Sequence, residues 1–160
     1  MQKKVSALIA VRSGSVRVKN KNIRTFNDST LLELKIKQLQ SVKEINDVVV
    51  NSNSDEMLSI AKNLGAKTVK REDYYASNTI SMISVFEHMA KNMDCENILY
   101  ANCTNPLVST NSYSDAIRIF LNNTSVYDSL GSCHDIKEFL YLDGKALNYD
   151  PMNQPRSQDL

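Results

Sequence analysis

VSALIAVRSGSVRVKNKNIR, residues 5–24, is the stretch that decides the fold predicted for this chain. Residues 5–11 form an apolar run that is typical of a buried strand in a parallel sheet. The residues that follow form a loop rich in small and basic side chains, at the carboxyl end of that strand. Ligands of open α/β sheets bind at this end, where backbone N–H groups can face phosphate oxygens. The stretch therefore predicts a site for a polyanion such as a nucleoside triphosphate.

The basic loop has a simpler interpretation, because lysine and arginine side chains are mostly at the surface. Its five cations are Arg12, Arg17, Lys19, Lys21 and Arg24. The loop contains neither the Walker A pattern nor G-x-G-x-x-G. Its position directly after the first strand favours a binding site over an ordinary solvated loop.

Length and composition are those of one domain with a real core. The chain has 160 residues, of which 42% are hydrophobic and 23% charged, and its formal net charge is +1. This balance argues against a general nucleic-acid binder, and no apolar run has the length of a membrane span. We expect a cytoplasmic protein with no nucleic-acid or membrane partner. We also expect no metal site, and Cys95, Cys103 and Cys133 as buried or half-buried free thiols.

Short apolar strands and amphipathic helices alternate along the chain. After the first strand, strands are predicted at residues 48–50, 67–70 and 97–101, and helices at residues 31–40, 54–64, 77–90 and 112–121. Ser54 is the expected N-cap of the second helix and Gly65 its C-cap glycine. In the third helix, opened by residues 77–79, we expect Met82, Ile83, Val85, Phe86, Met89 and Ala90 to face inward. The alternation predicts an α/β fold with a mainly parallel sheet and helices on both faces.

The pattern changes beyond residue 127. Residues 128–134, 139–142 and 145–149 are predicted strands, with a hairpin turn at Asp143-Gly144. Residues 150–160 show no periodicity and end on a polar loop, from which we expect a chain cut short of its natural end.

Five stretches, in order, resemble the motifs of one enzyme family. Residues 11–24 resemble A-R-x-G-S-K-x-I/V-P-x-K-N-I/L-R, residues 48–53 resemble V-I-V-S-T-D, and residues 71–81 resemble R-P-x-x-x-A-x-D-x-x-S. Residues 101–107 resemble L-Q-P-T-S-P-L, and residues 154–160 resemble R-x-Q-D-L-P. The sequence is therefore similar to the acylneuraminate (sialic acid) cytidylyltransferase family, whose members make CMP-activated nine-carbon sugar acids.

The resemblance implies a Rossmann-like nucleotide-diphospho-sugar transferase fold. It implies one nucleotidyltransferase domain over residues 1–160, incomplete at its C-terminus, with a small β-rich dimerisation excursion at residues 128–149. The implied partners are CTP, a nonulosonic (sialic-acid-like) sugar acid and a second copy of the chain. The implied reaction joins the sugar acid to CTP and releases pyrophosphate.

The resemblance also assigns roles to particular residues. Arg12 and Lys21 are the predicted catalytic residues, acting on the phosphates of CTP. The predicted nucleotide-binding residues are Arg12, Ser13, Gly14, Ser15, Arg17, Lys21, Asn22, Arg71 and Ser81. The predicted substrate-binding residues are Asn102, Thr104, Asn105, Arg156 and Gln158.

Several positions depart from the family pattern. Val16 stands where the family has its phosphate-loop lysine, and Arg17 or Lys19 are candidates to supply that charge. Asn53 and Asn78 stand where the family has aspartates. The family's acidic C-terminal motif, which holds Mg²⁺, is not in this chain, so the resemblance implies Mg²⁺ with its usual ligands outside these residues.

The leading hypothesis is a cytidylyltransferase that joins CTP to a nonulosonic acid. One alternative is a catalytically weak nucleotide-binding and dimerisation module, which the missing acidic motif favours. A second alternative is a related sugar nucleotidyltransferase that uses another base, because a few pocket contacts decide the choice of base.

Overall fold

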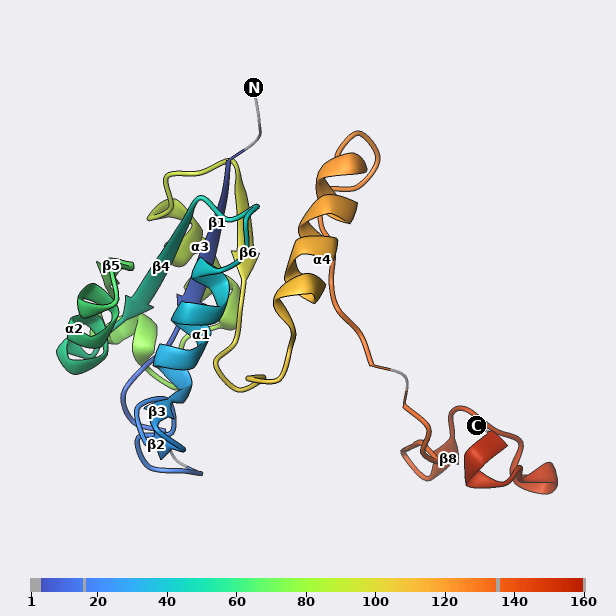
Figure 1. The fold of residues 1–160 in the computed structure, drawn as a ribbon. Coiled ribbons are helices and arrows are strands. Elements are labelled where there is room, and N and C mark those ends of the chain that lie inside the picture. Colours follow the sequence, from blue (N-terminus) through green and yellow to red (C-terminus); the bar gives the residue numbers. More distant parts are fainter. Residues whose placement is uncertain (1–3, 16, 135, 160) are drawn as a thin grey trace. The chain divides into compact units, whose positions relative to one another are not determined.

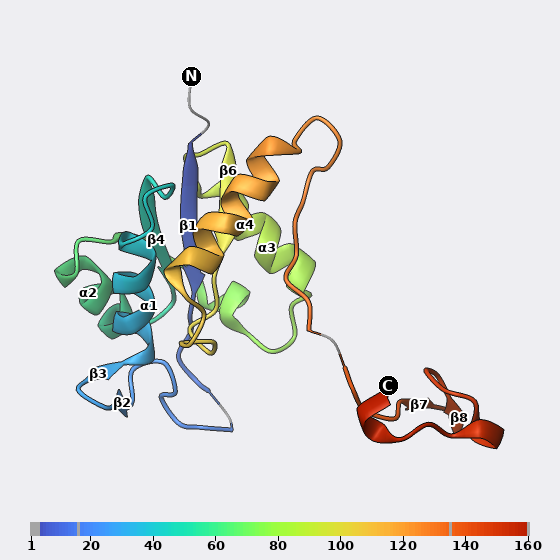
Figure 2. The same ribbon diagram turned by 45° about the vertical axis from the view of Figure 1, so that its right-hand side comes forward.

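The computed structural model describes residues 4–15, 17–134 and 136–159. It divides the chain into two compact units, Met1–Asp128 and Ser129–Leu160, and each is described by itself. The first unit carries the sheet and its helices, and the second carries only short elements (Figures 1 and 2).

A four-stranded parallel sheet forms the centre of the first unit. Its strands are β1 (Val5–Ala10), β4 (Asp47–Ser52), β5 (Lys67–Lys70) and β6 (Asn97–Tyr100), in the order β5-β4-β1-β6. Leu8 of β1 lies opposite Val49 of β4 and Tyr100 of β6. Parallel neighbours need crossover connections, and a helix lies in each of them. The predicted parallel α/β sheet is confirmed.

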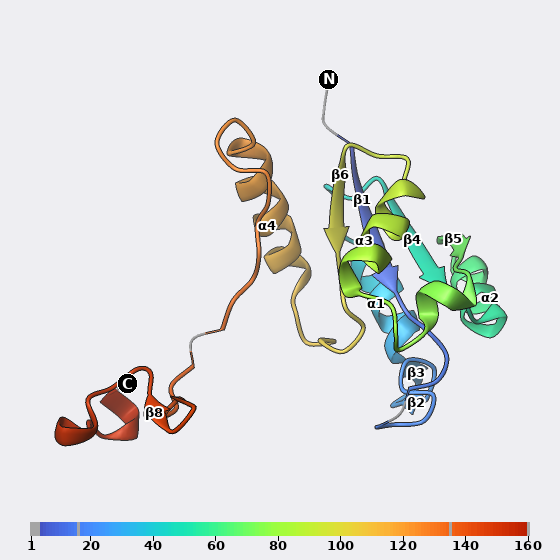
Figure 3. The same ribbon diagram turned by 180° about the vertical axis from the view of Figure 1, so that it is seen from behind.

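Helices cover both faces of this sheet. They are α1 (Leu31–Gln40), α2 (Asp55–Asn63), α3 (Met82–Lys91) and α4 (Thr110–Asn122). Ala7 and Ile9 of β1 belong to a core shared with α1, α2 and α4, whereas Leu8 packs with Val85 of α3 in a smaller core. This alternation follows from the two-residue period of a strand. Figures 1 and 3 show α1 and α3 on opposite faces, as the sequence predicts.

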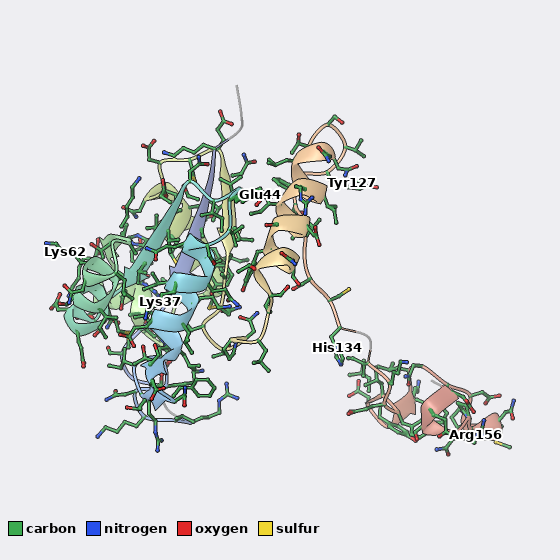
Figure 4. The ribbon with its side chains drawn as sticks, viewed as in Figure 1. Lys37, Glu44, Lys62, Tyr127, His134 and Arg156 are labelled. Atoms are coloured by element: carbon green, nitrogen blue, oxygen red, sulfur yellow. The ribbon has the colours of Figure 1, made fainter. Side chains whose placement is uncertain are left out.

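Each helix begins at a hydroxyl side chain that accepts a hydrogen bond from its first turn. Thr30 accepts from Glu33 N, and Ser54 accepts from Met57 N. Gly65 follows α2 with φ +76°, a conformation that glycine adopts without strain. The predicted caps of α2 are confirmed. On the outer faces, Lys37 of α1 and Lys62 of α2 extend away from the sheet and are exposed (Figure 4).

The prediction for α3 was wrong in two respects. A short 3₁₀ turn, η1 (Asp73–Ala76), comes first, and the α-helix begins only after Ser81, whose hydroxyl accepts from Ser84 N. The hydroxyl and amide side chains of residues 77–79 compete with helical hydrogen bonds, which favours the observed turn. Of the six expected inward residues, only Val85 and Met89 are buried, while Met82, Ile83, Phe86 and Ala90 are exposed. Helix α3 covers the sheet beside the edge strand β6, so only a narrow stripe of it meets the core.

The second unit contains one short hairpin. Strands β7 (Tyr141–Leu142) and β8 (Lys145–Ala146) pair antiparallel across Asp143 and Gly144, whose φ values are +49° and +75°. The predicted turn is confirmed, although both strands are shorter than expected. Two 3₁₀ turns, η2 (Pro151–Asn153) and η3 (Ser157–Asp159), follow.

The predicted strand at residues 128–134 is absent from the structure, because none of the described strands pairs with this segment. Cys133, in the same segment, is exposed, which corrects the expectation of a buried thiol. Cys103 is buried and Cys95 half-buried, as predicted. Among the described residues, no helix combines the length and the apolarity that crossing a bilayer requires.

Candidate functional site

A cavity of about 850 Å³ opens at the carboxyl end of the sheet in the first unit. Its walls come from the loop after β1, the start of the segment after β5, the η1–α3 connection, and the end of β6 with the loop that follows. This is the edge at which ligands of parallel α/β sheets bind. The position predicted from residues 5–24 is therefore a hollow of the size that small-molecule sites have.

The side chains that line this cavity carry charge of one sign. Arg12, Arg17, Lys21 and Arg71 all contribute to its wall. No aspartate or glutamate is among the described residues that line it. Four cations without a facing carboxylate make a strongly positive hollow, which attracts polyanions.

Arg12 is held in place by uncharged acceptors. Its Nη1 donates to Ala76 O at 2.5 Å, and its Nη2 donates to Asn78 Oδ1 at 2.6 Å. Both partners come from the η1–α3 connection, more than sixty residues along the chain. Because neither acceptor is ionised, they orient the guanidinium and leave its charge available to an anion in the cavity.

A second network ties the same loop to the end of β4. Asn53 Oδ1 accepts from Ser13 N at 3.1 Å, and Asn53 Nδ2 donates at 3.0 Å to both Ser13 Oγ and Asp73 Oδ1. Only an amide can accept from one partner and donate to the others in this way. An aspartate at position 53 would instead place a like charge against Asp73. The asparagine that departs from the family pattern therefore suits its neighbours.

Two left-handed residues shape the loop between β1 and the short strand β2 (Thr25–Phe26). Gly14 has φ +77° and Asn20 has φ +55°. The carbonyl oxygen of Asn20 accepts two backbone hydrogen bonds, from Ile23 N at 3.0 Å and from Arg24 N at 2.8 Å. Asn22 is buried, and its carbonyl accepts from Leu32 N at 2.9 Å, which anchors the loop to the start of α1. These bonds fix the segment that carries Lys21 into the cavity.

Arg71 is almost fully buried and joins the ends of three strands. Its Nε donates to Asn51 Oδ1 at 2.7 Å, and its Nη2 donates to Val11 O and Asn51 O, both at 2.8 Å. Its own N–H donates to Ser52 O at 2.8 Å. Burial lowers the pKa of the Arg71 guanidinium, and nearby Arg12 adds to this effect. Arg71 was predicted as a nucleotide contact, and the structure gives it a structural task as well.

The cavity wall also carries apolar and aromatic side chains. Ile80, Val85 and Met89 line it, together with Tyr75 and Tyr100. The Tyr75 ring stacks on His88, with ring centroids 3.9 Å apart and planes 18° from parallel. Burial raises the pKa of Tyr100, so this hydroxyl stays protonated at neutral pH. Cationic and aromatic side chains in one wall together suit a ligand with a charged part and a flat, less polar part.

The structure brings about half of the predicted site residues to this one cavity. Those that line it are Arg12, Ser15, Arg17, Lys21, Asn22, Arg71 and Thr104. Those of the first unit that do not line it are Ser13, Gly14, Ser81, Asn102 and Asn105, and Ser81 caps α3. Arg156 and Gln158 belong to the second unit, where Arg156 Nε donates to Asp159 Oδ2 at 2.7 Å. Val16 lies outside the described residues.

Sequence reasoning missed several residues of the cavity wall. Tyr75, Ile80 and Tyr100 reach it from distant parts of the chain. Asn78 was noted only as a departure from the family, yet it holds Arg12. The sequence shows only that Asn78 is a polar residue between two structural elements. It does not show that Arg12 is the residue that Asn78 holds.

The described residues do not supply a metal centre. Within residues 4–15, 17–134 and 136–159, no three histidine, cysteine, aspartate or glutamate side chains gather where they could hold an ion. Mg²⁺ prefers carboxylates, and Asp73, the acidic residue bonded into the Ser13 network, is already an acceptor for Asn53. The described residues therefore do not form a ligand set for the implied Mg²⁺ by themselves.

Comparison with known proteins supports the fold and the family. The chain is 25% identical to an N-acylneuraminate cytidylyltransferase from Oncorhynchus mykiss, over 97% of this chain and 38% of that protein. It is 26% identical to a pseudaminic acid cytidylyltransferase from Campylobacter jejuni, over 96% of this chain and 71% of that protein. A solved CMP:2-keto-3-deoxy-manno-octonic acid synthetase complexed with CTP shares the fold, with a TM-score of 0.67 at 11% identity, over 76% of this chain and 49% of that one.

The chain therefore spans well under half of the Oncorhynchus mykiss relative and about seven tenths of the Campylobacter jejuni relative. A family model described as "Cytidylyltransferase" matches residues 6–154, which include every wall of the cationic cavity. With the parallel sheet, the cavity at its carboxyl edge and this match in agreement, the chain belongs to the cytidylyltransferase family.

Proposed function

We propose that the cavity binds CTP and that the protein transfers its cytidylyl group to a nonulosonic sugar acid, with release of pyrophosphate. The observation that carries this proposal is the wall of four cations, Arg12, Arg17, Lys21 and Arg71, which no described carboxylate faces. A triphosphate is the polyanion that such a wall suits, and membership of the family favours cytidine as the base.

Arg12 and Lys21 are proposed to act on the phosphates. In the reaction, a hydroxyl oxygen of the sugar acid bonds to the α-phosphorus and its proton is released to solvent. The bond from that phosphorus to the bridging oxygen breaks, and pyrophosphate leaves with the electron pair. Negative charge grows on the leaving oxygens, so cations already held in position lower the barrier. The neutral acceptors on Arg12 suit this role, because they fix the guanidinium without cancelling its charge.

The nucleoside is proposed to lie toward Asn22 and the aromatic side. Asn22 and Arg71 contribute polar groups there, while Tyr75 and Tyr100 contribute flat surfaces. Ser13, Gly14, Ser15 and Arg17 would complete the phosphate end, and Ser81 remains proposed on the nucleoside side. This division assigns the phosphates to the basic loop after β1 and the nucleoside to the aromatic residues of the wall.

The sugar acid is proposed to enter beside the loop after β6. Thr104 lines the cavity, and Asn102 and Asn105 are its near neighbours in sequence. Arg156 and Gln158 remain proposed contacts of the sugar acid. The names of the relatives from Oncorhynchus mykiss and Campylobacter jejuni support a nonulosonic acid as the acceptor. We further propose a homodimer formed through residues 128–149 and a requirement for Mg²⁺, which supplies additional positive charge at the phosphates when bound.

Product formation tests this proposal. The chain is incubated with CTP, Mg²⁺ and either N-acetylneuraminic or pseudaminic acid, and CMP-sugar and pyrophosphate are measured separately. Formation of both in equal amounts is expected, with none when UTP or ATP replaces CTP. CTP binding without product would favour the nucleotide-binding module, and absence of CTP binding would refute the proposal.

A further inference from the structure

Lys35 is a buried cation that the proposed chemistry does not use. It lies on α1, and only 1% of its surface is exposed. Lysine is almost never fully buried unless it is paired with an acid. The ion pairs of the described residues do not include Lys35, so its charge is satisfied in another way.

Three oxygens surround the ammonium group. Lys35 Nζ donates to Gln38 Oε1 at 2.5 Å, to Tyr113 Oη at 2.7 Å and to Asn105 O at 3.0 Å. An ammonium has three N–H donors, so all of them are used. Burial lowers the pKa of Lys35, as expected where the acceptors are neutral.

Gln38, one turn further along α1, extends this arrangement. Its Oε1 accepts from Lys35, while its Nε2 donates to Pro106 O at 3.5 Å and to Val108 O. The two side chains, three residues apart, share one face of the helix. Together they hold the carbonyls of residues 105, 106 and 108, all in the loop that joins β6 to α4.

This loop reaches the cavity at Thr104, directly before the first held carbonyl. A loop fixed from behind by a rigid helix presents its front side chains in one position, which a specific site requires. We propose that Lys35 and Gln38 are positioning residues that hold the β6–α4 loop and so set the acceptor side of the site at Thr104 and Asn105. This inference rests on the proposed function only in naming the acceptor.

Lys35→Met tests whether Lys35 holds the loop, because methionine is also unbranched, is one atom shorter and lacks the three donors. The matched control is Lys37→Met, the same change two residues away at an exposed position of the same helix (Figure 4). Hydrogen exchange is followed by mass spectrometry over residues 101–116, which include the hydrogen-bonded first turns of α4, and over β1 and β4. The loop and these first turns should exchange about ten-fold faster in Lys35→Met, with β1 and β4 unchanged, since local opening reports local stability. Lys37→Met should leave both regions unchanged.

Steady-state kinetics supplies the functional readout. The KM for the sugar acid should rise about ten-fold in Lys35→Met, while the KM for CTP and kcat stay within about two-fold, because the loop positions one substrate only. Gln38→Met removes the bonds to Pro106 and Val108 and one of the three acceptors of Lys35 Nζ. It should give the same pattern and serves if Lys35→Met does not fold.

Unchanged hydrogen exchange in the loop and the first turns of α4, or an equal acceleration of exchange in β1 and β4, would refute the proposal that Lys35 and Gln38 hold the loop. Equal rises in both KM values would show a general loss of structure and would also overturn it. A parent chain without CTP binding would refute the proposed function alone, since the exchange result needs no turnover.

Discussion

Arg71→Met tests whether Arg71 supports the site or only contacts the ligand. Methionine occupies similar space but lacks donors for the acceptors on β4 and at the end of β1. Arg71 is 5% exposed, and its guanidinium makes three hydrogen bonds that join Asn51 and Val11. Loss of these bonds should loosen the edge of the sheet on which the cavity is built.

The magnitude follows from the acceptors left behind. Asn51 O keeps a second donor, Val11 N, at 3.1 Å, whereas Val11 O and Asn51 Oδ1 lose their guanidinium donor. Each buried acceptor without a partner costs about 1–3 kcal/mol. Release of the buried charge offsets part of this cost. The net loss in free energy of unfolding should therefore be about 2–4 kcal/mol.

Urea denaturation at pH 7 measures this loss. With a slope of about 2 kcal/mol/M, the midpoint should fall by about 1–2 M. Lys70→Met is the matched control, because Lys70 is exposed and pairs only with the exposed carboxylate of Asp55, at 2.5 Å, which is a contact of little net value. A midpoint unchanged in Arg71→Met, with CTP binding lost, would refute the structural role and make Arg71 a ligand contact alone.

Three further predictions concern the site, the core and the second unit. Arg12→Ala should weaken CTP binding about ten-fold or more in calorimetry, because a charge-assisted hydrogen bond is lost, whereas Arg24→Ala, in the same loop but not in the cavity wall, should not. Equal effects of these two substitutions would contradict the role of Arg12. Burial raises the pKa of Cys103 to about 12, so the folded thiol keeps its proton where the unfolded one, near 8.5, loses it. Stability from this group is therefore complete below about pH 8.5 and declines above it, and the free energy of unfolding of the parent should fall by about 2 kcal/mol relative to Cys103→Ala between pH 8 and pH 10 in urea titrations. A constant difference between the two proteins would contradict this. The chain should sediment as a dimer at micromolar concentration and as a monomer once residues 129–160 are removed, and a dimer that survives the truncation would exclude these residues as the interface.

Local sequence signals predicted most of the first unit. The buried run at residues 5–11 identified β1 because its side chains alternate between two apolar cores, so both faces of the strand had to be apolar. Ser54 and Gly65 marked the ends of α2 by chemistry that acts within a single turn. Such signals are local, and a single sequence is enough to read them.

The errors arose where neighbours in space decide the outcome. Helix α3 begins at Met82 because Ser81 caps it, and earlier hydroxyl residues offered equally good caps in the sequence. Its outer residues, Ile83 and Phe86, are exposed because the sheet ends at β6, and periodicity alone cannot show where a sheet ends.

In the candidate site too, the sequence indicated some residues by local position and missed the contacts that depend on neighbours in space. Arg12 and Lys21 line the cavity and belong to the basic loop after the first strand, a position that has meaning in every α/β sheet. The acceptors on Arg12, Ala76 and Asn78, lie in a connection whose path no periodic signal predicts. The bonds of Lys35 to Asn105 and Tyr113 were missed for a related reason, since lysine on a helix is expected to face solvent.

Calorimetric titration of the chain with CTP, CMP, UTP and ATP, with and without Mg²⁺, tests the central claim that the cationic cavity is a CTP site. The wall of Arg12, Arg17, Lys21 and Arg71 predicts that CTP binds at least about ten-fold more tightly than CMP, and that salt weakens CTP binding more. Membership of the cytidylyltransferase family predicts that UTP and ATP bind more weakly than CTP. Equal affinity for CTP and CMP, or no binding of any nucleotide, would contradict the account.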